Sequence, residues 1–175
     1  LFSEWHGFWN KHFKEVNSTY KLFSEDLLRT TYVTCIHSNS TPTAMHFYTV
    51  WNLENITHLH SRYLQQYPRD ILEKIKERGI KRAMSMEYFY VHPEWRFQKS
   101  KIPFSEVLVG LGLKTSLEKK AIDGVISIAR QATKSQERGT NWGFWTAGDI
   151  EVHNNMCSIV VCGREDYQEN TNSTI

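Results

Sequence analysis

The sequence predicts an α/β (α+β) fold in which helices pack on both faces of one sheet. Helical and strand-like segments alternate along the 175 residues, and one segment in the middle is apolar on both of its faces, as is usual for a central strand. This length suits one domain, so we expect a single domain over residues 1–175. Hydrophobic residues make up 40% and only four residues are prolines, which argues against a disordered or collagen-like chain.

The N-terminal half predicts one helix, then a hairpin, then two further helices. Aromatic side chains recur every three to four residues in the first segment, as in an amphipathic helix. Turn residues between two β-branched and aromatic runs indicate the hairpin. Pro68 separates the next two helices and Gly79 ends the second, because proline lacks an amide donor and glycine favours helix ends. The expected elements are helix Phe2–Val16, strands Thr30–Ser38 and Thr43–Trp51, and helices Glu54–Tyr67 and Arg69–Arg78.

The C-terminal half begins with the central strand, Arg82–Val91. Strand alternation places Glu87 on the same face as Phe89. A helical pattern follows Pro103, which is acceptable at a helix start, and a terminal hairpin is expected to turn at Asn154-Asn155. The remaining elements are helix Phe104–Lys120, strand Asp123–Arg130, short helix Gln131–Arg138, and strands Phe144–His153 and Met156–Cys162.

Charge and cysteine content narrow the class of protein. The net charge of +2 is too small to indicate a nucleic-acid partner, and no apolar run of membrane-spanning length occurs. The three cysteines and eight histidines show no metal-ligand spacing, so we expect no metal site, reduced thiols and a cytoplasmic location. The opening Leu1 suggests that an upstream segment is absent, and the polar residues 164–175 are expected to be a frayed tail.

The segment after the central strand is locally basic. Arg96, Lys99 and Lys101 place three positive charges within six residues, between a strand and a helix. Ligands gather where strands end and helices begin, and clustered cations can bind a phosphate. Charge alone favours a solvated basic loop over a phosphate site, so the segment is a candidate site only.

The run Val91-His92-Pro93-Glu94-Trp95-Arg96 also resembles the strand-end signature of the GNAT acyltransferases. Downstream, residues 123–130, 131–142 and Gly143-Phe144 are similar, in the right order, to that family's next strand, short helix and penultimate strand, so the likeness covers about residues 82–163. The resemblance implies a mixed, mostly antiparallel central sheet with helices on both faces. It also implies an N-acyltransferase that moves an acyl group from a thioester to the amine of a small molecule or amino acid.

Two departures bear on the acyl donor. The family's glycine-bearing phosphate loop is absent, since residues 97–101 contain no glycine, and no tyrosine stands shortly before Gly143. A branch that resembles N-acyl amino acid synthases and homoserine-lactone synthases also lacks that loop and takes acyl chains from acyl carrier protein. The resemblance therefore implies acyl-CoA or an acyl-carrier-protein thioester as co-substrate, with no tightly bound cofactor. The expected donor-binding residues are Val91, Arg96, Gln98, Lys99, Ser100 and Lys101.

Two residues are candidates for removing the proton of the amine. Glu87 lies on the central strand among apolar neighbours, where burial raises a carboxyl pKa toward neutrality. An equally good interpretation makes Glu87 a structural partner of Arg82 or Arg130. His92 follows the strand directly and is a secondary candidate, although a loop histidine is often simply exposed.

Two other functions remain open. The chain could be a catalytically inactive GNAT-like domain that binds a ligand, because both the glycine loop and the tyrosine are missing. It could also be a peptide or protein acetyltransferase that uses acetyl-CoA through an unusual loop.

Overall fold

A six-stranded sheet organises the fold. The computed structural model describes residues 2–16, 18–20, 22 and 24–167, and its strand order is β1-β2-β3-β4-β6-β5. Only β3 and β4 run parallel, and every other neighbouring pair is antiparallel, which confirms the mixed, mostly antiparallel sheet. The strands are β1 (Tyr32–Ser38), β2 (Thr41–Asn52), β3 (Arg82–Val91), β4 (Gly124–Arg130), β5 (Trp145–Val152) and β6 (Asn155–Gly163).

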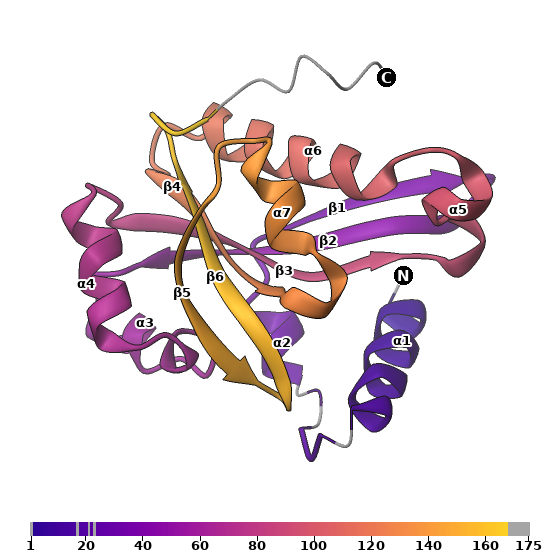
Figure 1. The fold of residues 1–175 in the computed structure, drawn as a ribbon, viewed down its shortest axis with the longest axis horizontal. Coiled ribbons are helices and arrows are strands. Elements are labelled where there is room, and N and C mark those ends of the chain that lie inside the picture. The colour runs from indigo at the N-terminus through magenta and orange to yellow at the C-terminus, as the bar shows by residue number, and fades with distance from the viewer. Residues whose placement is uncertain (1, 17, 21, 23, 168–175) are drawn as a thin grey trace.

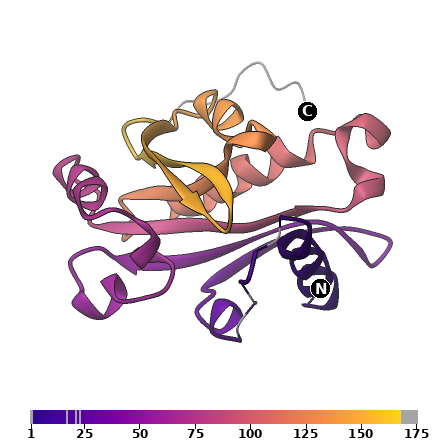
Figure 2. The same cartoon turned by 60° about the horizontal axis from the view of Figure 1, so that its bottom comes forward.

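Helices cover both faces of this sheet, as the sequence predicts (Figures 1 and 2). On one face lie the N-terminal helices together with α4, and on the other lie α6 and α7. The α-helices are α1 (Phe2–Glu15), α2 (Ser24–Leu28), α3 (Ile56–Leu59), α4 (Arg69–Glu77), α5 (Phe97–Ser100), α6 (Phe104–Glu118) and α7 (Ser135–Thr140). Short 3-10 turns are η1 (Leu64–Gln66), η2 (Pro93–Trp95) and η3 (Gln131–Thr133).

Several expected boundaries are wrong. The helix expected over 54–67 breaks into α3 and η1, because Asn55 caps a four-residue helix and His60 ends it. Helix α2 was not expected, and the basic loop after β3 contains α5. The last hairpin turns at His153 and Asn154, one residue early, where both residues adopt the positive φ of a tight hairpin turn.

The end of the described chain is held to the body of the protein. Arg164 donates from its guanidinium to backbone carbonyls at the end of α6, including that of Leu117 at 3.0 Å. Asp166 accepts from Trp145 Nε1 at 3.0 Å. Residues 164–167 of the expected frayed tail are therefore in contact, and residues 168–175 lie outside the described residues. The three cysteines are free thiols, as expected.

A β-bulge divides the central strand. Phe47 of β2 pairs with Glu87, whereas Met45 pairs with Tyr90, so β3 carries one extra residue between them. Tyr88 in the bulge has a φ of 52°, which non-glycine residues rarely adopt. The extra residue reverses the alternation, so Phe89 packs toward α6 while Glu87 and Tyr88 stay on the face of α1 and α2. The expectation that Glu87 and Phe89 share a face is wrong for this reason.

Strands β3 and β4 separate where the bulge begins. They pair through three positions only, from Ala83 opposite Gly124 to Ser85 opposite Ile126. Just beyond this stretch, the Ser127 hydroxyl donates to the Met86 carbonyl at 2.8 Å. From Glu87 onward the β4-facing edge of β3 has no strand partner among the described residues. The structure thus contains an opening between two parallel strands at the centre of its sheet.

Candidate functional site

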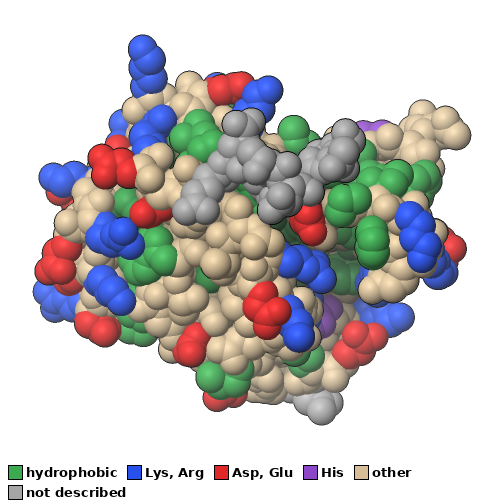
Figure 3. All heavy atoms as spheres, turned by 45° about the horizontal axis from the view of Figure 1, so that its top comes forward, with side chains coloured by type: hydrophobic (Ala, Val, Ile, Leu, Met, Phe, Trp, Pro, Cys, Tyr) green, Lys and Arg blue, Asp and Glu red, His purple; other side chains and the backbone are tan. Residues whose placement is uncertain are grey.

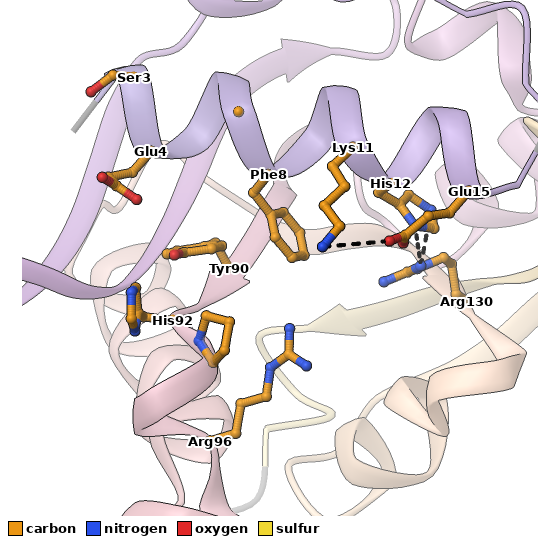
Figure 4. A pocket seen from close by; sticks show the side chains of 12 residues that line it. Ser3, Glu4, Phe8, Lys11, His12, Glu15, Tyr90, His92, Arg96 and Arg130 are labelled. Atoms are coloured by element: carbon orange, nitrogen blue, oxygen red, sulfur yellow. Dashed lines mark hydrogen bonds and ion pairs between the residues drawn. The ribbon is translucent and has the colours of Figure 1, made fainter.

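A pocket of about 600 Å³ lies beside this opening. Its walls are helix α1, the end of β3 with the turn that follows it, and the end of β4 (Figure 4). Its volume is in the range of pockets that hold small molecules. Its lining includes Gly7, Phe8, His12, Tyr90, Arg96 and Arg130.

Helix α1 presents different side chains to the sheet and to the pocket. Trp5 and Phe13 are buried against the sheet and its neighbours. Gly7 and Lys11 lie on the pocket side of the same helix. At Gly7 a Cβ atom would find nothing within 4 Å, so the pocket reaches the helix backbone there. The amphipathic helix expected from the sequence is confirmed, and it serves as a wall as well as a packing element.

Two arginines face the pocket from opposite sides of the opening. Arg96 comes from the turn after β3 and Arg130 is the last residue of β4 (Figure 4). Among the described residues, neither guanidinium has a carboxylate partner, whereas Lys11 is 3.8 Å from Glu15. Burial lowers the pKa of Arg130 from its ordinary value, which is the sign of a charge removed from water without a compensating anion. Lys11, Arg96 and Arg130 face two lining carboxylates, Glu4 and Glu15, so the pocket carries one more positive than negative charge.

His12 holds Arg130 in place. Arg130 Nη1 lies 2.9 Å from His12 Nε2, and the guanidinium also lies 5.8 Å from the centre of the Trp9 ring. Burial lowers the pKa of His12, and the positive charge of Arg130 lowers it further. A neutral imidazole can accept the arginine hydrogen bond and keeps the positive charge of Arg130 undiminished.

Most of the expected donor-binding residues point elsewhere. Lys99 is ion-paired with Glu94, the Ser100 hydroxyl donates to the Trp95 carbonyl at 2.9 Å, and Lys101 Nζ donates to the Gln98 carbonyl at 3.1 Å. Gln98 is exposed. The amides of residues 99–101 already bond within α5.

Val91 and Arg96 are better placed with respect to the opening. Val91 packs at the end of β3, next to the cluster under α6, and Arg96 lines the pocket. The structure thus brings one of the three expected cations to the cavity.

Glu87 lies in a buried ion-pair network and not in the pocket wall. Its carboxylate accepts from Arg29, which follows α2, and from the Ser85 hydroxyl. Arg29 also contacts Asp26 at 3.1 Å. Burial raises the pKa of Glu87, while Arg29 and Ser85 oppose the shift. The prediction that Glu87 has a structural arginine partner is confirmed, but the partner is Arg29 and not Arg82 or Arg130.

His92 lines the pocket at the end of β3. Its Nδ1 accepts from the Glu94 amide at 3.3 Å, which caps the η2 turn. Because Nδ1 accepts, the neutral ring carries its hydrogen on Nε2, which can donate to a ligand.

Sequence reasoning did not identify the α1 side of the site. Gly7, Phe8 and His12 reach the pocket only in three dimensions, because α1 is remote in sequence from the β3 end. Arg130 was considered only as a partner for Glu87. The one available signal was its position at the end of the strand next to the central one, where ligands commonly bind.

Comparison with known proteins supports the fold. No protein-family model and no curated protein sequence matches this chain. An N-acyl amino acid synthase from uncultured soil microbes, FeeM, has a similar structure, with 10% identity, a TM-score of 0.62, and coverage of 90% of this chain and 83% of that chain. An aminoglycoside N-acetyltransferase has 8% identity, a TM-score of 0.53, and coverage of 83% and 73%. Another, solved with ribostamycin and coenzyme A, has 12% identity, a TM-score of 0.51, and coverage of 86% and 74%.

These likenesses define the fold class. The chain has the fold of the GNAT acyltransferases, as its motifs predict. The identities are too low for the likeness to carry an activity. Within the described residues, no group of three or more metal-ligating side chains occurs, and no helix there is both long and apolar enough to cross a lipid bilayer.

Proposed function

We propose that this protein is an N-acyltransferase that moves an acyl group from an acyl-thioester to the amine of a small molecule or amino acid. The observation that carries the proposal is the separation of β3 from β4 after Ser85 and Ile126, beside a cationic pocket. A gap between parallel strands exposes backbone groups that can bind an extended thioester and polarise its carbonyl. The solved structures of similar fold include one with coenzyme A.

The reaction needs no covalent intermediate. The amine nitrogen attacks the thioester carbonyl carbon, the C–N bond forms, and the C–S bond breaks. The proton lost by the amine ends on the departing thiolate. Two proton acceptors are proposed. Glu87 would act through water from the bulge. His92, which lines the pocket, would take the proton on Nδ1 in exchange for its bond to the Glu94 amide.

The surface around α5 supports a carrier protein as donor. Phe97 is 58% exposed and Ile102 is 42% exposed, and Lys99 and Lys101 lie between them. Figure 3 shows hydrophobic side chains beside Lys and Arg side chains at this end of the molecule. Carrier proteins are acidic and their pantetheine arm has one phosphate, so we assign that phosphate to Arg96 and the carrier surface to α5. Acyl-CoA remains the alternative donor.

Release of free thiol tests the activity. The protein is incubated with acetyl, octanoyl and palmitoyl thioesters, each on coenzyme A and on acyl carrier protein, together with a mixture of amines and amino acids. We expect thiol release that depends on an amine, with a lower KM for the carrier-bound donor. A specific observation favours a non-catalytic binding domain, since the amides of 99–101 are already bonded. Absence of thiol release from every donor would select that second function.

Two variants test the proton acceptors. His92→Gln and Glu87→Gln are each compared with the parent in kcat and in donor binding, after thermal unfolding confirms that both are folded. A base that acts in the chemical step lowers kcat and leaves donor binding unchanged. An unchanged kcat removes that residue from the mechanism.

A further inference from the structure

We infer that the pocket under α1 binds an acceptor that carries a carboxylate, and that Arg130, held by His12, recognises it. This inference rests on the proposed function and deepens it, because it names the chemical class of the acceptor. It also extends the site to residues from α1 and β4 that the sequence did not indicate.

Arg130 lacks a carboxylate partner among the described residues. A guanidinium removed from water is normally paired with a carboxylate, as Arg29 is paired with Glu87 and Asp26 in the same structure. Arg130 is partly buried, and its partners in the described chain are a neutral histidine and an aromatic ring. A ligand carboxylate would supply the missing negative charge, and the planar guanidinium suits that group through two parallel hydrogen bonds.

His12 orients the guanidinium of Arg130. The imidazole accepts a hydrogen bond from Nη1 of Arg130. The guanidinium also lies over the Trp9 ring, which is its second contact. These two contacts fix the guanidinium at the end of β4. Figure 4 shows Arg130 beside His12. His12 acts through Arg130, so it is a positioning residue and not a catalytic one.

The pocket also has an apolar part. Phe8 and Tyr90 pack edge to face with ring centres 4.9 Å apart, and both line the pocket. Gly7 also lines the pocket and leaves open space beside the helix backbone. The pocket therefore suits a small amphiphilic acceptor, with its carboxylate on Arg130 and an apolar side chain near Phe8 and Gly7.

Paired acceptors of equal size test this inference. Leucine and leucinamide have the same side chain, and leucinamide replaces the carboxylate by a neutral amide; its amine is less basic, so the two are compared at a pH where both amines are unprotonated. With the parent protein and a thioester donor, we expect kcat/KM to favour leucine by about tenfold or more, which corresponds to one charge-assisted hydrogen-bonded contact. Arg130→Gln should abolish this preference and raise the KM of leucine, but not that of the donor. Arg82→Gln, an exposed arginine at the start of β3, is the matched control and should retain the preference.

The positioning role of His12 has its own readout. His12→Gln retains an acceptor atom and should retain most of the preference for leucine. His12→Leu removes the acceptor and should lose the preference, although Arg130 remains present. Equal preference in both variants would assign His12 a purely structural role and would overturn this part of the inference.

A binding measurement separates this inference from the proposed function. N-decanoyl-leucine and N-decanoyl-leucinamide are titrated against the parent and against Arg130→Lys and Arg130→Gln by calorimetry. We expect the acid to bind at least about tenfold more tightly than the amide, with the difference reduced in the lysine variant and absent in the glutamine variant. If no thioester reacts but this pattern holds, the proposed function fails and the carboxylate site stands. Equal binding of acid and amide, or an effect of Arg130→Gln on the KM of the donor alone, overturns the inference.

Discussion

The two halves of the β3–β4 pair differ in almost every physical respect. In the closed half, Ala83–Ser85 of β3 pairs with Gly124–Ile126 of β4, and these residues are fully buried or nearly so. In the open half, β3 continues through its bulge to Val91 without β4, and the space beside it is a pocket with unbalanced positive charge.

One sheet thus provides both a scaffold and a site. Parallel pairing fixes the direction of the two strands, and the bulge at Glu87 and Tyr88 ends that pairing at a defined point. The ion pair of Glu87 with Arg29 lies at this junction. Stability should therefore be concentrated on the closed side, and tolerance of substitution on the open side.

The largest expected loss of unfolding free energy comes from the Arg29–Glu87 ion pair, at the point where β3 and β4 separate. Arg29→Met leaves the buried Glu87 carboxylate without its cation, and removing one partner of a buried pair typically costs about 3–5 kcal/mol. We expect a loss of unfolding free energy of this size in urea denaturation. The double variant Arg29→Met with Glu87→Leu should recover part of it, because the Glu87 charge is then absent while buried Asp26 still lacks its arginine.

An exposed pair provides the control for this prediction. Lys76 and Glu73 are 2.8 Å apart on α4, and Lys76→Met should change the unfolding free energy by less than about 1 kcal/mol. Similar losses in Arg29→Met and Lys76→Met would show that the junction has no special importance for stability.

The next effect lies within the closed half. A Cβ atom at Gly124 would be 2.8 Å from the Cys162 carbonyl oxygen and 3.2 Å from the Gly163 Cα atom. Because both are backbone atoms of β6, Gly124→Ala must displace a strand, and overpacking of this kind costs about 1–3 kcal/mol. Urea denaturation should show this loss, and an unchanged midpoint would mean that the closed half is less rigid than its packing implies.

The closed half was also the more predictable part of the fold. The positions of β3 and β4 follow from local β-branched and apolar runs, and both were expected within one residue of their observed bounds. The prediction of one helix over 54–67 was wrong, because turns within the segment outweigh its helical composition. The bulge left no local signal, because it arises from how β3 meets β2.

The site was predictable only on the β3 side. A short motif placed Arg96 and His92 at a strand end, and both line the pocket. The α1 wall, Arg130 and the pairing of Arg29 with Glu87 depend on residues far apart in the chain. No spacing rule links such residues, so sequence patterns could not assemble them.

The unfolding free energy should depend on pH through His46, which is buried on the other face of the sheet from α1. His46 on β2 lies opposite the bulge, buried against the Phe89 and Tyr48 rings, and burial lowers its pKa to about 3 from 6.5. The unfolded chain then binds this proton more readily than the folded chain. Stability from this group is complete above pH 6.5 and falls by about 1.4 kcal/mol per pH unit at lower pH.

His46→Phe should remove this contribution, because it keeps a ring and abolishes the titration. The measurement is the unfolding free energy from pH 7 to about pH 4 for both proteins, and the expected result is a flatter profile for the variant. Parallel profiles would mean that His46 remains accessible to protons in the folded state.

The smallest effect is expected at Gly7, on the pocket wall. Glycine in the middle of a helix costs about 0.5–1 kcal/mol relative to alanine, and a Cβ atom here meets nothing within 4 Å. Gly7→Ala should therefore raise the unfolding free energy by up to this amount, in contrast to the loss at Gly124. Gly7→Leu should keep the helix but fill the pocket, and so weaken binding of N-decanoyl-leucine. Unchanged binding in Gly7→Leu would show that the ligand does not approach α1, and the contrast between the two halves would then rest on stability alone.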